Sequence, residues 1–424
     1  MNDRAAAARI AVIGAGWAGL VAAVECVTRG FAVTLFEAGR VAGGRARTTT
    51  IAGRSLDNGQ HILLGAYRDT LALMQRVGAD PQKLFQRHPL RILEGDVFRL
   101  HLPRLPAPLH LAAGLLGAHG VTWQEKIRTA LWMQGIKNQK FRLHTKQSVA
   151  DWLDSAGQTG ALRQHLWEPL CLAALNTPPK QACAQLFAHV LRDSLGSPQR
   201  ASTDLLLPRA PFGALLPDPA LLWLKKHGAE IRLGHRVRHV QGTQVDGGHF
   251  SAVIVAVAPQ HLAALLPGSP GTFDYEPIAT VYLDYGANLA LDFPLRHLGA
   301  GTAAWAVDRG QGMIGCAVSG HGDWETLSDA ALAARMSAAL GLGSPRWQQV
   351  IREKRATFSA RPGLSDPNSR PHYRTAHPRV FLAGDYTWAD YPATLEAAVR
   401  SGLRAARAAC TASASTDHAS KQPA

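Results

Sequence analysis

Three closely spaced glycines near the start of the chain, followed by a carboxylate, have the types and spacing that could hold a dinucleotide. Gly14, Gly16 and Gly19 lie within the sequence IAVIGAGWAGL, and Glu37 ends the next apolar run. Gly14 would permit a tight turn, Gly16 would let the backbone approach a pyrophosphate, and Gly19 would allow a helix to pack closely. Glu37 is placed to accept hydrogen bonds from the ribose of an adenosine. These residues predict a dinucleotide-binding site.

The elements expected around these residues are those that such a site requires. Residues 10–13 predict a short buried strand, residues 17–28 a helix with a face of small side chains, and residues 33–36 a second strand. The alternative is a glycine-rich turn that holds no ligand. The complete order of strand, helix, strand and acid favours the dinucleotide.

A second group of glycines and arginines suits the neighbourhood of a phosphate. Gly43 and Gly44 leave the backbone open to a ligand, and Arg45 or Arg47 could meet the charge of a pyrophosphate with a planar fork of donors. A surface turn with solvated arginines is the alternative. The residues of this group alone leave both interpretations open.

The end of the chain again shows a buried strand followed by an acid and a helix. Residues 380–383 predict the strand, Gly384 and Asp385 stand at its end, and an alanine-rich helix is expected from Thr394 to Ala409. Joined in space to the first unit, Asp385 could bind ribityl or phosphate oxygens. The N-terminus of the helix could direct its N–H dipoles at the pyrimidine edge of a flavin.

Six motifs along nearly the whole chain carry a resemblance to a known family. They are GAGWAGL at 14–20, GGRA at 43–46, DNGQHILLGAY at 57–67, WEPLCLAALNTP at 167–178, LAGD at 382–385 and PATLEAAVRSG at 392–402. The sequence resembles the flavin-containing amine oxidase and phytoene desaturase superfamily and, within it, the squalene-associated branch of the hydroxysqualene dehydroxylases. The first, second and fifth motifs are shared by the superfamily, and the third and fourth are typical of the branch.

The resemblance implies that the chain binds FAD. It places Gly59 to His61 near the isoalloxazine and the backbone of Val237 at the adenine. No cysteine stands shortly before the final helix, where Tyr391 and Pro392 lie, so we expect FAD to be bound without a covalent link. The implied cofactor contacts are Gly14, Gly16, Gly19, Glu37, Gly43, Gly44, Arg45, Gly59, Gln60, Val237, Gly384, Asp385, Thr394 and Leu395.

The fold class that follows is α/β, with a doubly wound, Rossmann-type FAD-binding domain of glutathione-reductase type and an interleaved α+β substrate domain. The FAD-binding domain is expected in three pieces, 1–64, 217–265 and 375–412. Residues 65–216, mostly helical in pattern, and 266–374, which alternate like antiparallel strands, would form the substrate domain. The tail at 413–424 is small and polar and should be disordered.

The resemblance implies reductive dehydroxylation of hydroxysqualene to squalene in bacterial hopanoid and squalene biosynthesis. A flavin-dependent desaturase or amine oxidase, which takes hydride from a carotenoid precursor, a porphyrinogen or an amine, is the alternative. A flavin-binding escort for prenyl-lipid enzymes, without catalysis, is a third possibility. The residues by themselves indicate an FAD-binding oxidoreductase with a large apolar substrate.

His61 and Asp57 are the candidate catalytic residues, because loss of a hydroxyl group needs a general acid near the oxygen. His61 can titrate near neutral pH. The alternatives are that Asp57 caps a turn and that His61 hydrogen-bonds the flavin or the main chain. Trp167 and Asn176 are candidate substrate contacts: Trp167 could stack on a polyene or cover a cation, although a tryptophan at helical spacing is more often part of a core.

Composition restricts the remaining choices. The five cysteines form no C-x-x-C motif and, with the histidines, no metal-ligand cluster, so no disulfide framework or metal site is expected and a reducing cytoplasm fits. No apolar run in the sequence is long enough to span a bilayer. Nothing in the sequence indicates an oligomeric state.

The net charge of +14 comes from basic residues scattered along the chain. There is no basic stripe interleaved with aromatic residues, which argues against nucleic acid. Peripheral binding to an anionic membrane is more plausible, because a squalene-like substrate dissolves in the bilayer. Residues 84–145, with apolar 109–116 beside several lysines and arginines, are the candidate membrane-facing surface, and a buried helical hairpin is the equal alternative.

Overall fold

The centre of the molecule is a five-stranded parallel sheet that brings together distant parts of the chain. The computed structural model describes residues 8–143, 146–269, 273–287, 289, 294–299 and 302–419, with the backbone alone for 415–419. The strand order is β10-β2-β1-β14-β20, and all four pairings are parallel. These strands are β1 (Arg9–Ile13), β2 (Ala32–Glu37), β10 (Glu230–Leu233), β14 (Ala252–Val255) and β20 (Val380–Leu382).

Each of the three segments assigned to the FAD-binding domain contributes at least one strand to this sheet. The boundaries of the two domains stay a prediction. The four residues of β14 are all buried, as expected of a strand covered on both faces. The carboxyl ends of β1, β2 and β14 therefore meet at one edge of the sheet, where an open α/β sheet binds its ligand.

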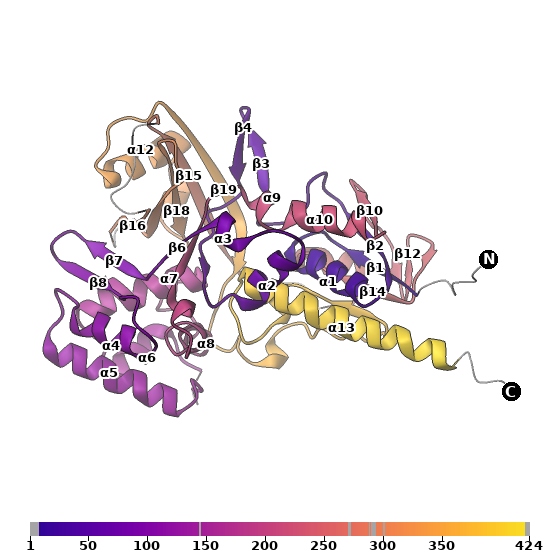
Figure 1. Cartoon of the computed structure of the whole chain (residues 1–424), viewed down its shortest axis with the longest axis horizontal. Coiled ribbons are helices and arrows are strands. Elements are labelled where there is room, and N and C mark those ends of the chain that lie inside the picture. Colours follow the sequence, from indigo (N-terminus) through magenta and orange to yellow (C-terminus); the bar gives the residue numbers. More distant parts are fainter. Residues whose placement is uncertain are drawn as a thin grey trace.

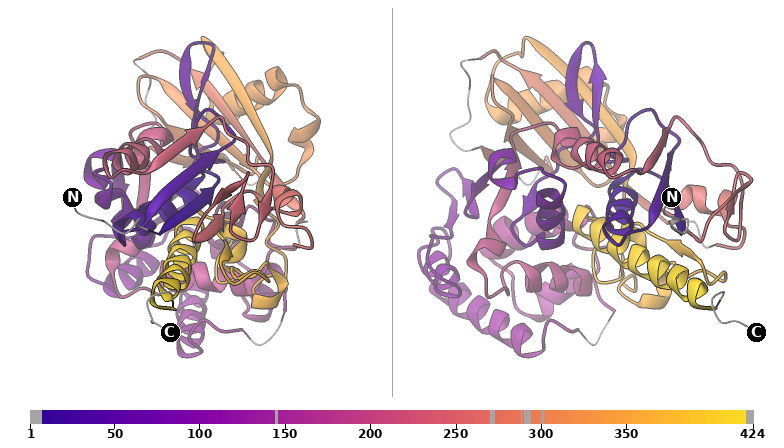
Figure 2. Two further views of the ribbon diagram at one scale, coloured as in Figure 1. Left: turned by 90° about the vertical axis from the view of Figure 1, so that its right-hand side faces the viewer. Right: turned by 45° about the vertical axis from the view of Figure 1, so that its right-hand side comes forward.

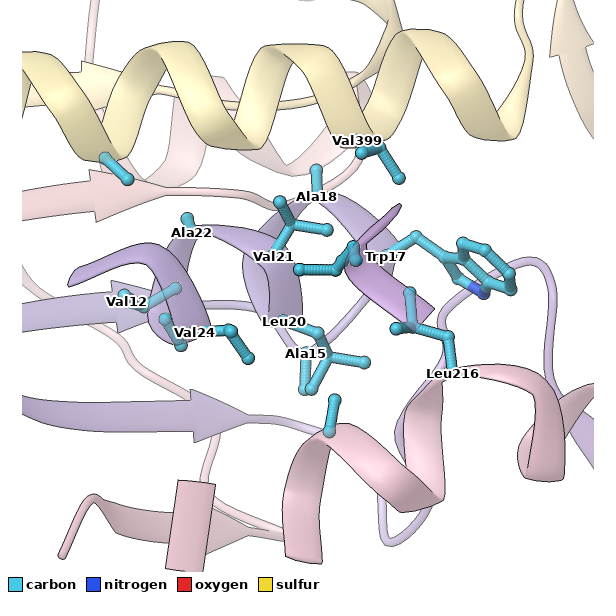
Figure 3. Close-up of a cluster of buried hydrophobic side chains, with 14 of the residues drawn as sticks. Val12, Ala15, Trp17, Ala18, Leu20, Val21, Ala22, Val24, Leu216 and Val399 are labelled. Carbon is cyan, nitrogen blue, oxygen red and sulfur yellow. The ribbon is translucent and has the colours of Figure 1, made fainter. Parts of the chain in front are cut away.

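Two helices from opposite ends of the chain cover one face of the parallel sheet. Helix α1 (Trp17–Thr28) follows β1 directly, and α13 (Leu395–Ala419) packs along it. Figure 3 shows Ala18 and Val21 of α1 beside Val399 of α13. A Cβ atom at Gly402 would lie 2.3 Å from the carbonyl oxygen of Ala18, so the small residue is what lets the two helices approach.

The second half of the molecule holds an antiparallel sheet and a group of helices. The sheet order is β16-β17-β18-β15-β19, and α12 (Asp329–Leu340) packs on it. Figure 1 and the right-hand view of Figure 2 show this sheet above the helices α4 to α8, with the parallel sheet to their side. The strands are β15 (Tyr275–Asp284), β16 (Leu295–His297), β17 (Ala304–Asp308), β18 (Met313–Ser319) and β19 (Trp347–Phe358).

The other elements connect these two halves. The helices are α2 (Arg68–Arg76), α3 (Pro81–Leu84), α4 (Leu109–Leu116), α5 (Trp123–Asn138), α6 (Val149–Ser155), α7 (Glu168–Leu175), α8 (Ala184–Asp193), α9 (Phe212–Leu215), α10 (Pro217–Lys226) and α11 (Leu262–Leu265). The short strands are β3 (Thr48–Ile51), β4 (Arg54–Asp57), β5 (Leu63–Leu64), β6 (Phe85–His88), β7 (Arg91–Glu94), β8 (Phe98–His101), β9 (Leu205–Pro208), β11 (Val240–Gln241), β12 (Gln244–Val245) and β13 (Gly248–His249).

Two sequence expectations differ from this structure. Residues 65–216 were expected to be mostly helical, but they contain the strands β6 to β9 as well as helices. The sequence did not indicate these strands, because four residues are too few to show a period of two. Helix α13 continues to Ala419, so residues 413–419 are helical rather than a disordered tail, and Ser413 is buried. Residues 420–424 of that expected tail lie outside the described residues.

Candidate active site

A large cavity lies where the two halves of the molecule meet. Its volume is about 880 Å³, and its walls come from the ends of β1 and β2, from the loops after β4 and β20, and from β15, β18 and β19. Of the residues predicted to bind FAD, all except Gly19 line this cavity. One end is polar and rich in glycine, and the other end is mainly apolar.

The turn after β1 brings the backbone to the edge of this cavity. Gly14 has a φ of +102°, and a Cβ atom there would lie 2.7 Å from the carbonyl oxygen of Ala256, so only glycine suits the position. A Cβ atom at Gly19 would collide with the Gly14 carbonyl at 1.8 Å, so Gly19 acts by allowing α1 to pack. At Gly16 the nearest neighbouring atom to such a Cβ would be 3.9 Å away. Space remains there for a ligand beside the N-terminus of α1.

The carboxylate of Glu37 lies in the same end of the cavity and orders the turn. Its Oε2 accepts a hydrogen bond from the N–H of Ala15 at 2.7 Å, and its Oε1 accepts one from the N–H of Gly39 at 2.7 Å. Each carboxylate oxygen can accept a second bond, so the group can also receive ribose hydroxyls. Val237 also lines this cavity.

The second glycine group lies against the first. The N–H of Gly43 donates to the carbonyl of Ala15 at 2.8 Å, and a Cβ at Gly44, whose φ is +61°, would lie 3.1 Å from the Cα of Gly16. The guanidinium of Arg45 donates to Asp385 at 2.7 Å and to the carbonyl of Ala356 at 2.9 Å. A charged pair thus joins the two motifs across the cavity.

This ion pair keeps Arg45 charged. Burial by itself would lower the pKa of the guanidinium, but the carboxylate of Asp385 outweighs that effect and the pKa lies above its usual value. A half-buried cation with unused N–H groups beside the cavity is suited to an anion such as a phosphate.

The N-terminus of α13 faces the cavity. Thr394 and Leu395 are part of the cavity lining, and the hydroxyl of Thr394 accepts a hydrogen bond from the N–H of Ala397 at 3.2 Å. This cap leaves other N–H groups of the first turn free to meet an electron-rich edge. The N–H of Gly384 donates to the hydroxyl of Ser401 at 2.9 Å, which fixes the loop after β20 against α13.

Gly59, Gln60 and His61 line the cavity from the loop that follows β4. The Nδ1 atom of His61 lies 3.3 Å from the carbonyl oxygen of Gly59, and the ring packs against Phe212 with 4.7 Å between ring centroids. A bond donated by Nδ1 leaves Nε2 without a proton in the neutral ring. Burial lowers the pKa of His61, although the Gly59 carbonyl and the charge of Asp57 oppose this.

Asp57 does not line the cavity, and the prediction that it acts as a catalytic acid is corrected by the structure. Its side chain is buried, with Oδ1 accepting from the N–H of Phe212 at 2.7 Å and from the hydroxyl of Thr48 at 3.0 Å. Its Oδ2 accepts from the guanidinium of Arg309 at 2.8 Å. Tyr282 donates its hydroxyl to the backbone carbonyl of Asp57 at 2.9 Å. The residue anchors the loop that carries His61.

The two predicted substrate contacts also differ from each other. Trp167 is buried outside the cavity lining, where it packs edge-on against Trp132 and donates its indole N–H to Gln158, so it belongs to the core. Asn176 does line the cavity. Its backbone is left-handed, its Oδ1 accepts from Gly320 N–H at 2.8 Å, and its Nδ2 donates to Thr357 at 3.0 Å.

The sequence interpretation missed several polar residues of the wall. Tyr67 closes the motif at 57–67, Tyr391 precedes the motif at 392–402, and both line the cavity. The hydroxyl of Tyr391 donates to the carboxylate of Asp193, which also lines it. The tyrosines border quoted motifs and could have been found, whereas Asp193 lies in α8 without a sequence signal.

The apolar end could enclose a long hydrocarbon chain. Its lining comes from β5, β7, α7, β9, β16 and β17, from the π-helical turn Arg163–Trp167, and from the residues just before β5 and β7. The residues are Ile62, Leu64, Leu90, Ile92, Leu166, Leu170, Ala174, Leu205, Leu295, Trp305 and Val307. In the part of the chain that the structure describes, no three His, Cys, Asp or Glu side chains gather as metal ligands, and no helix is long and apolar enough to cross a membrane.

Comparison with known proteins places this site in a family. The family model of the flavin containing amine oxidoreductases matches residues 17–410. The chain is 29% identical to the hydroxysqualene dehydroxylases of Rhodopseudomonas palustris, over 93% of this chain and 96% of that one, and of Zymomonas mobilis, over 93% and 97%. It is 25% identical to a probable zeta-carotene desaturase of Synechococcus elongatus, over 96% of this chain and 99% of that one.

Solved structures share the fold. A structure of putrescine oxidase with putrescine bound matches with a TM-score of 0.66 at 18% identity, covering 94% of this chain and 98% of that one. A putative protoporphyrinogen oxidase from an Exiguobacterium species matches with a TM-score of 0.65 at 16% identity, covering 95% of this chain and 99% of that one.

The family model spans most of the chain, and the fold and the expected family are confirmed. This chain belongs to the flavin containing amine oxidoreductase family and is a flavin-dependent oxidoreductase.

Proposed function

We propose that the chain binds FAD without a covalent link and removes the hydroxyl group of hydroxysqualene to give squalene, as a step of bacterial squalene or hopanoid synthesis. The observation that carries this proposal is one continuous cavity, which joins an end lined with glycines to an apolar chamber. The similarity to hydroxysqualene dehydroxylases along nearly the whole chain supports the choice of substrate.

The residues present fit FAD. The space at Gly16, the carboxylate of Glu37, the guanidinium of Arg45 and the N-terminus of α13 lie along one cavity, as the pyrophosphate, the ribose and the flavin ring each require. No cysteine occurs among the described residues that line the cavity, which supports non-covalent binding.

The reaction needs a hydride for the carbon and a proton for the leaving oxygen. When bound and reduced, FAD would supply this hydride. The carbon–oxygen bond breaks, and the oxygen leaves as water after it takes up a proton. The apolar walls would exclude bulk water from that carbon, and His61, which lines the same cavity, is the residue that we assign to the proton.

An assay of product distinguishes this function from the alternative. The same chamber would accept a carotenoid, and a desaturase relative supports that possibility. With an excess of dithionite and no oxygen, the protein should convert hydroxysqualene in detergent to squalene, detected by mass spectrometry. If squalene does not form, while aerobic incubation desaturates zeta-carotene, the desaturase function holds instead.

We further propose that the protein works at the cytoplasmic face of a membrane, through α4 and α5. Trp123, Ile127 and Leu131, four residues apart on α5, are 65%, 59% and 68% exposed. Leu109 and Leu116 of α4 are also exposed. This arrangement supports the lipid-facing interpretation over a buried hairpin.

Basic residues near this surface suit anionic headgroups. Lys137, Lys140 and Arg142 are exposed at the end of α5. Lys126 is different, because its ammonium group donates to the carbonyl of Leu116 at 2.6 Å and lies over the ring of Trp123. His144 and Thr145 of the expected surface lie outside the described residues.

A further inference from the structure

A second cavity, separate from the first, lies on the outer side of α13. Its volume is about 600 Å³, and it shares no lining residue with the larger cavity. The wall combines α13, the start of α2, the segment before β20 and the loop after it. Its polar and aromatic lining consists of Asp69, Tyr373, Arg374, Trp388, Arg400, Arg404, Arg407 and Thr411. We call it the arginine pocket.

The charge of the arginine pocket is not balanced by its own residues. Four arginines line it, against one carboxylate, that of Asp69. Arg400 is paired with Asp69 at 2.9 Å and with Glu396 at 3.0 Å, and Arg407 with Glu25 at 3.4 Å.

Two further arginines of the wall have other partners. Arg374 donates to the hydroxyl of Tyr373 at 3.1 Å, and Arg404 donates to the backbone carbonyl and the hydroxyl of Thr387. Among the described residues, neither Arg374 nor Arg404 has a carboxylate within 4.0 Å. Asp390 lies close enough to Arg404 to act on its charge, but burial outweighs it and lowers the pKa of that guanidinium.

Aromatic rings hold the cationic groups in place. The guanidinium carbon of Arg404 lies 4.4 Å from the centre of the Tyr373 ring and 4.7 Å from that of the Trp388 ring. The Nε atom of Arg404 and the indole nitrogen of Trp388 are buried, and neither has a hydrogen-bond partner among the described residues. A cation kept between two rings loses little rotamer freedom when it binds an anion.

We propose that the arginine pocket binds a phosphate-bearing small molecule. The guanidinium groups of Arg374 and Arg404 would meet the phosphate oxygens, and the rings of Tyr373 and Trp388 would pack against the organic part. The volume lies within the range of small-ligand sites. The phosphate could belong to a free metabolite or to a phospholipid headgroup. The inference does not depend on the reaction proposed above.

The test uses the protein saturated with FAD, so that a phosphate probe cannot enter the dinucleotide end of the larger cavity. Inorganic pyrophosphate is titrated by calorimetry into the parent protein and into Arg374→Gln, Arg404→Gln and Arg99→Gln. Arg99 is exposed on β8, far along the chain from the pocket, and its loss changes the net charge equally. We expect one saturable site, weakened about tenfold or more by each pocket variant and unchanged in Arg99→Gln.

Arg374 is exposed, so its variant keeps the test decisive if Arg404→Gln proves unstable. Sedimentation with phosphatidylcholine vesicles, with and without phosphatidylglycerol, then distinguishes the two sources. A loss of binding to the anionic vesicles in the Arg374→Gln variant assigns the pocket to a phospholipid headgroup, and unchanged vesicle binding assigns it to a free phosphate. Absence of saturable pyrophosphate binding, or equal affinity in parent and Arg374→Gln, would overturn the proposal.

Discussion

At the scale of residues, the burial of His61 determines the pH range in which its ring carries a proton that it can donate. The protonated ring is the donor, and burial lowers its pKa below the usual 6.5. The fraction that can donate a proton therefore rises as pH falls through that pKa. We predict that turnover of hydroxysqualene increases from pH 8 towards pH 5.5. His61→Gln should lower kcat by about a hundredfold and abolish the pH dependence. A parent profile that rises with pH would contradict the assignment.

Asp57 has a different role, and its replacement should separate stability from chemistry. Asp57→Asn leaves the buried Arg309 without its counter-charge, which should lower the free energy of unfolding by about 3 kcal/mol. The folded, flavin-loaded fraction should keep its kcat within a few fold, because the side chain does not reach the cavity. Urea unfolding and single-turnover assays measure the two quantities. Asp96→Asn, at an exposed position, is the control and should change neither.

The sequence could distinguish these two residues only in part. The motif at 57–67 contains both, and their types equally suit acid chemistry. The partner that occupies Asp57 is Arg309, which lies on the loop after β17 and has no motif of its own. Contacts between residues so far apart in the chain depend on the packing of β4 against the antiparallel sheet. The places of Gly14, Gly16 and Glu37 at the cavity could be expected from their spacing within local elements, whereas Arg45 could be chosen only through the family resemblance.

At the scale of elements, the approach of α13 to α1 is sensitive to a single methyl group. Gly402→Ala would place a Cβ atom 2.3 Å from the backbone oxygen of Ala18, and the helices would have to separate. We predict a loss of about 1 to 3 kcal/mol in unfolding free energy. Gly135→Ala in α5 is the matched control: nothing lies within 4 Å, so helix propensity should stabilise it by up to about 1 kcal/mol. Equal effects would show that packing is not the cause.

Elements were predictable where the pattern is local and strong. Strand β1, helix α1 and strand β2 were expected over 10–13, 17–28 and 33–36 and occur with nearly those bounds. The strands β6 to β9 were not expected, because four-residue strands are too short to show a clear period. The extension of α13 beyond Ala409 depends on packing that buries Ser413, which polar composition cannot reveal.

At the scale of the whole molecule, the exposed apolar residues of α4 and α5 should control membrane binding. The double variant Ile127→Asp, Leu131→Asp should weaken binding to phosphatidylglycerol-containing vesicles by tenfold or more. It removes two apolar side chains that would enter the lipid, and it adds two negative charges. Leu222→Asp is the control, because Leu222 on α10 is 69% exposed, like Leu131 at 68%. Co-sedimentation measures the result. If both variants bind as well as the parent, the surface is not a membrane contact.

The overall architecture could be predicted from the motifs at the two ends of the chain, because the two motifs must lie together to bind one dinucleotide. How the intervening residues close the apolar chamber was not predictable, since its walls come from seven or more short elements that pack by shape. The arginine pocket likewise joins residues of α2, of the segment before β20 and of α13 that no single motif contains.

The most direct measurement is an anaerobic single turnover. The purified protein with its flavin reduced by one equivalent of dithionite is mixed with hydroxysqualene in detergent micelles, while the flavin absorbance is recorded and squalene is quantified. We predict that the oxidised flavin spectrum returns without oxygen and that one squalene forms per flavin. A flavin that stays reduced until oxygen is admitted, with no squalene formed, would contradict reductive dehydroxylation as the function of this protein.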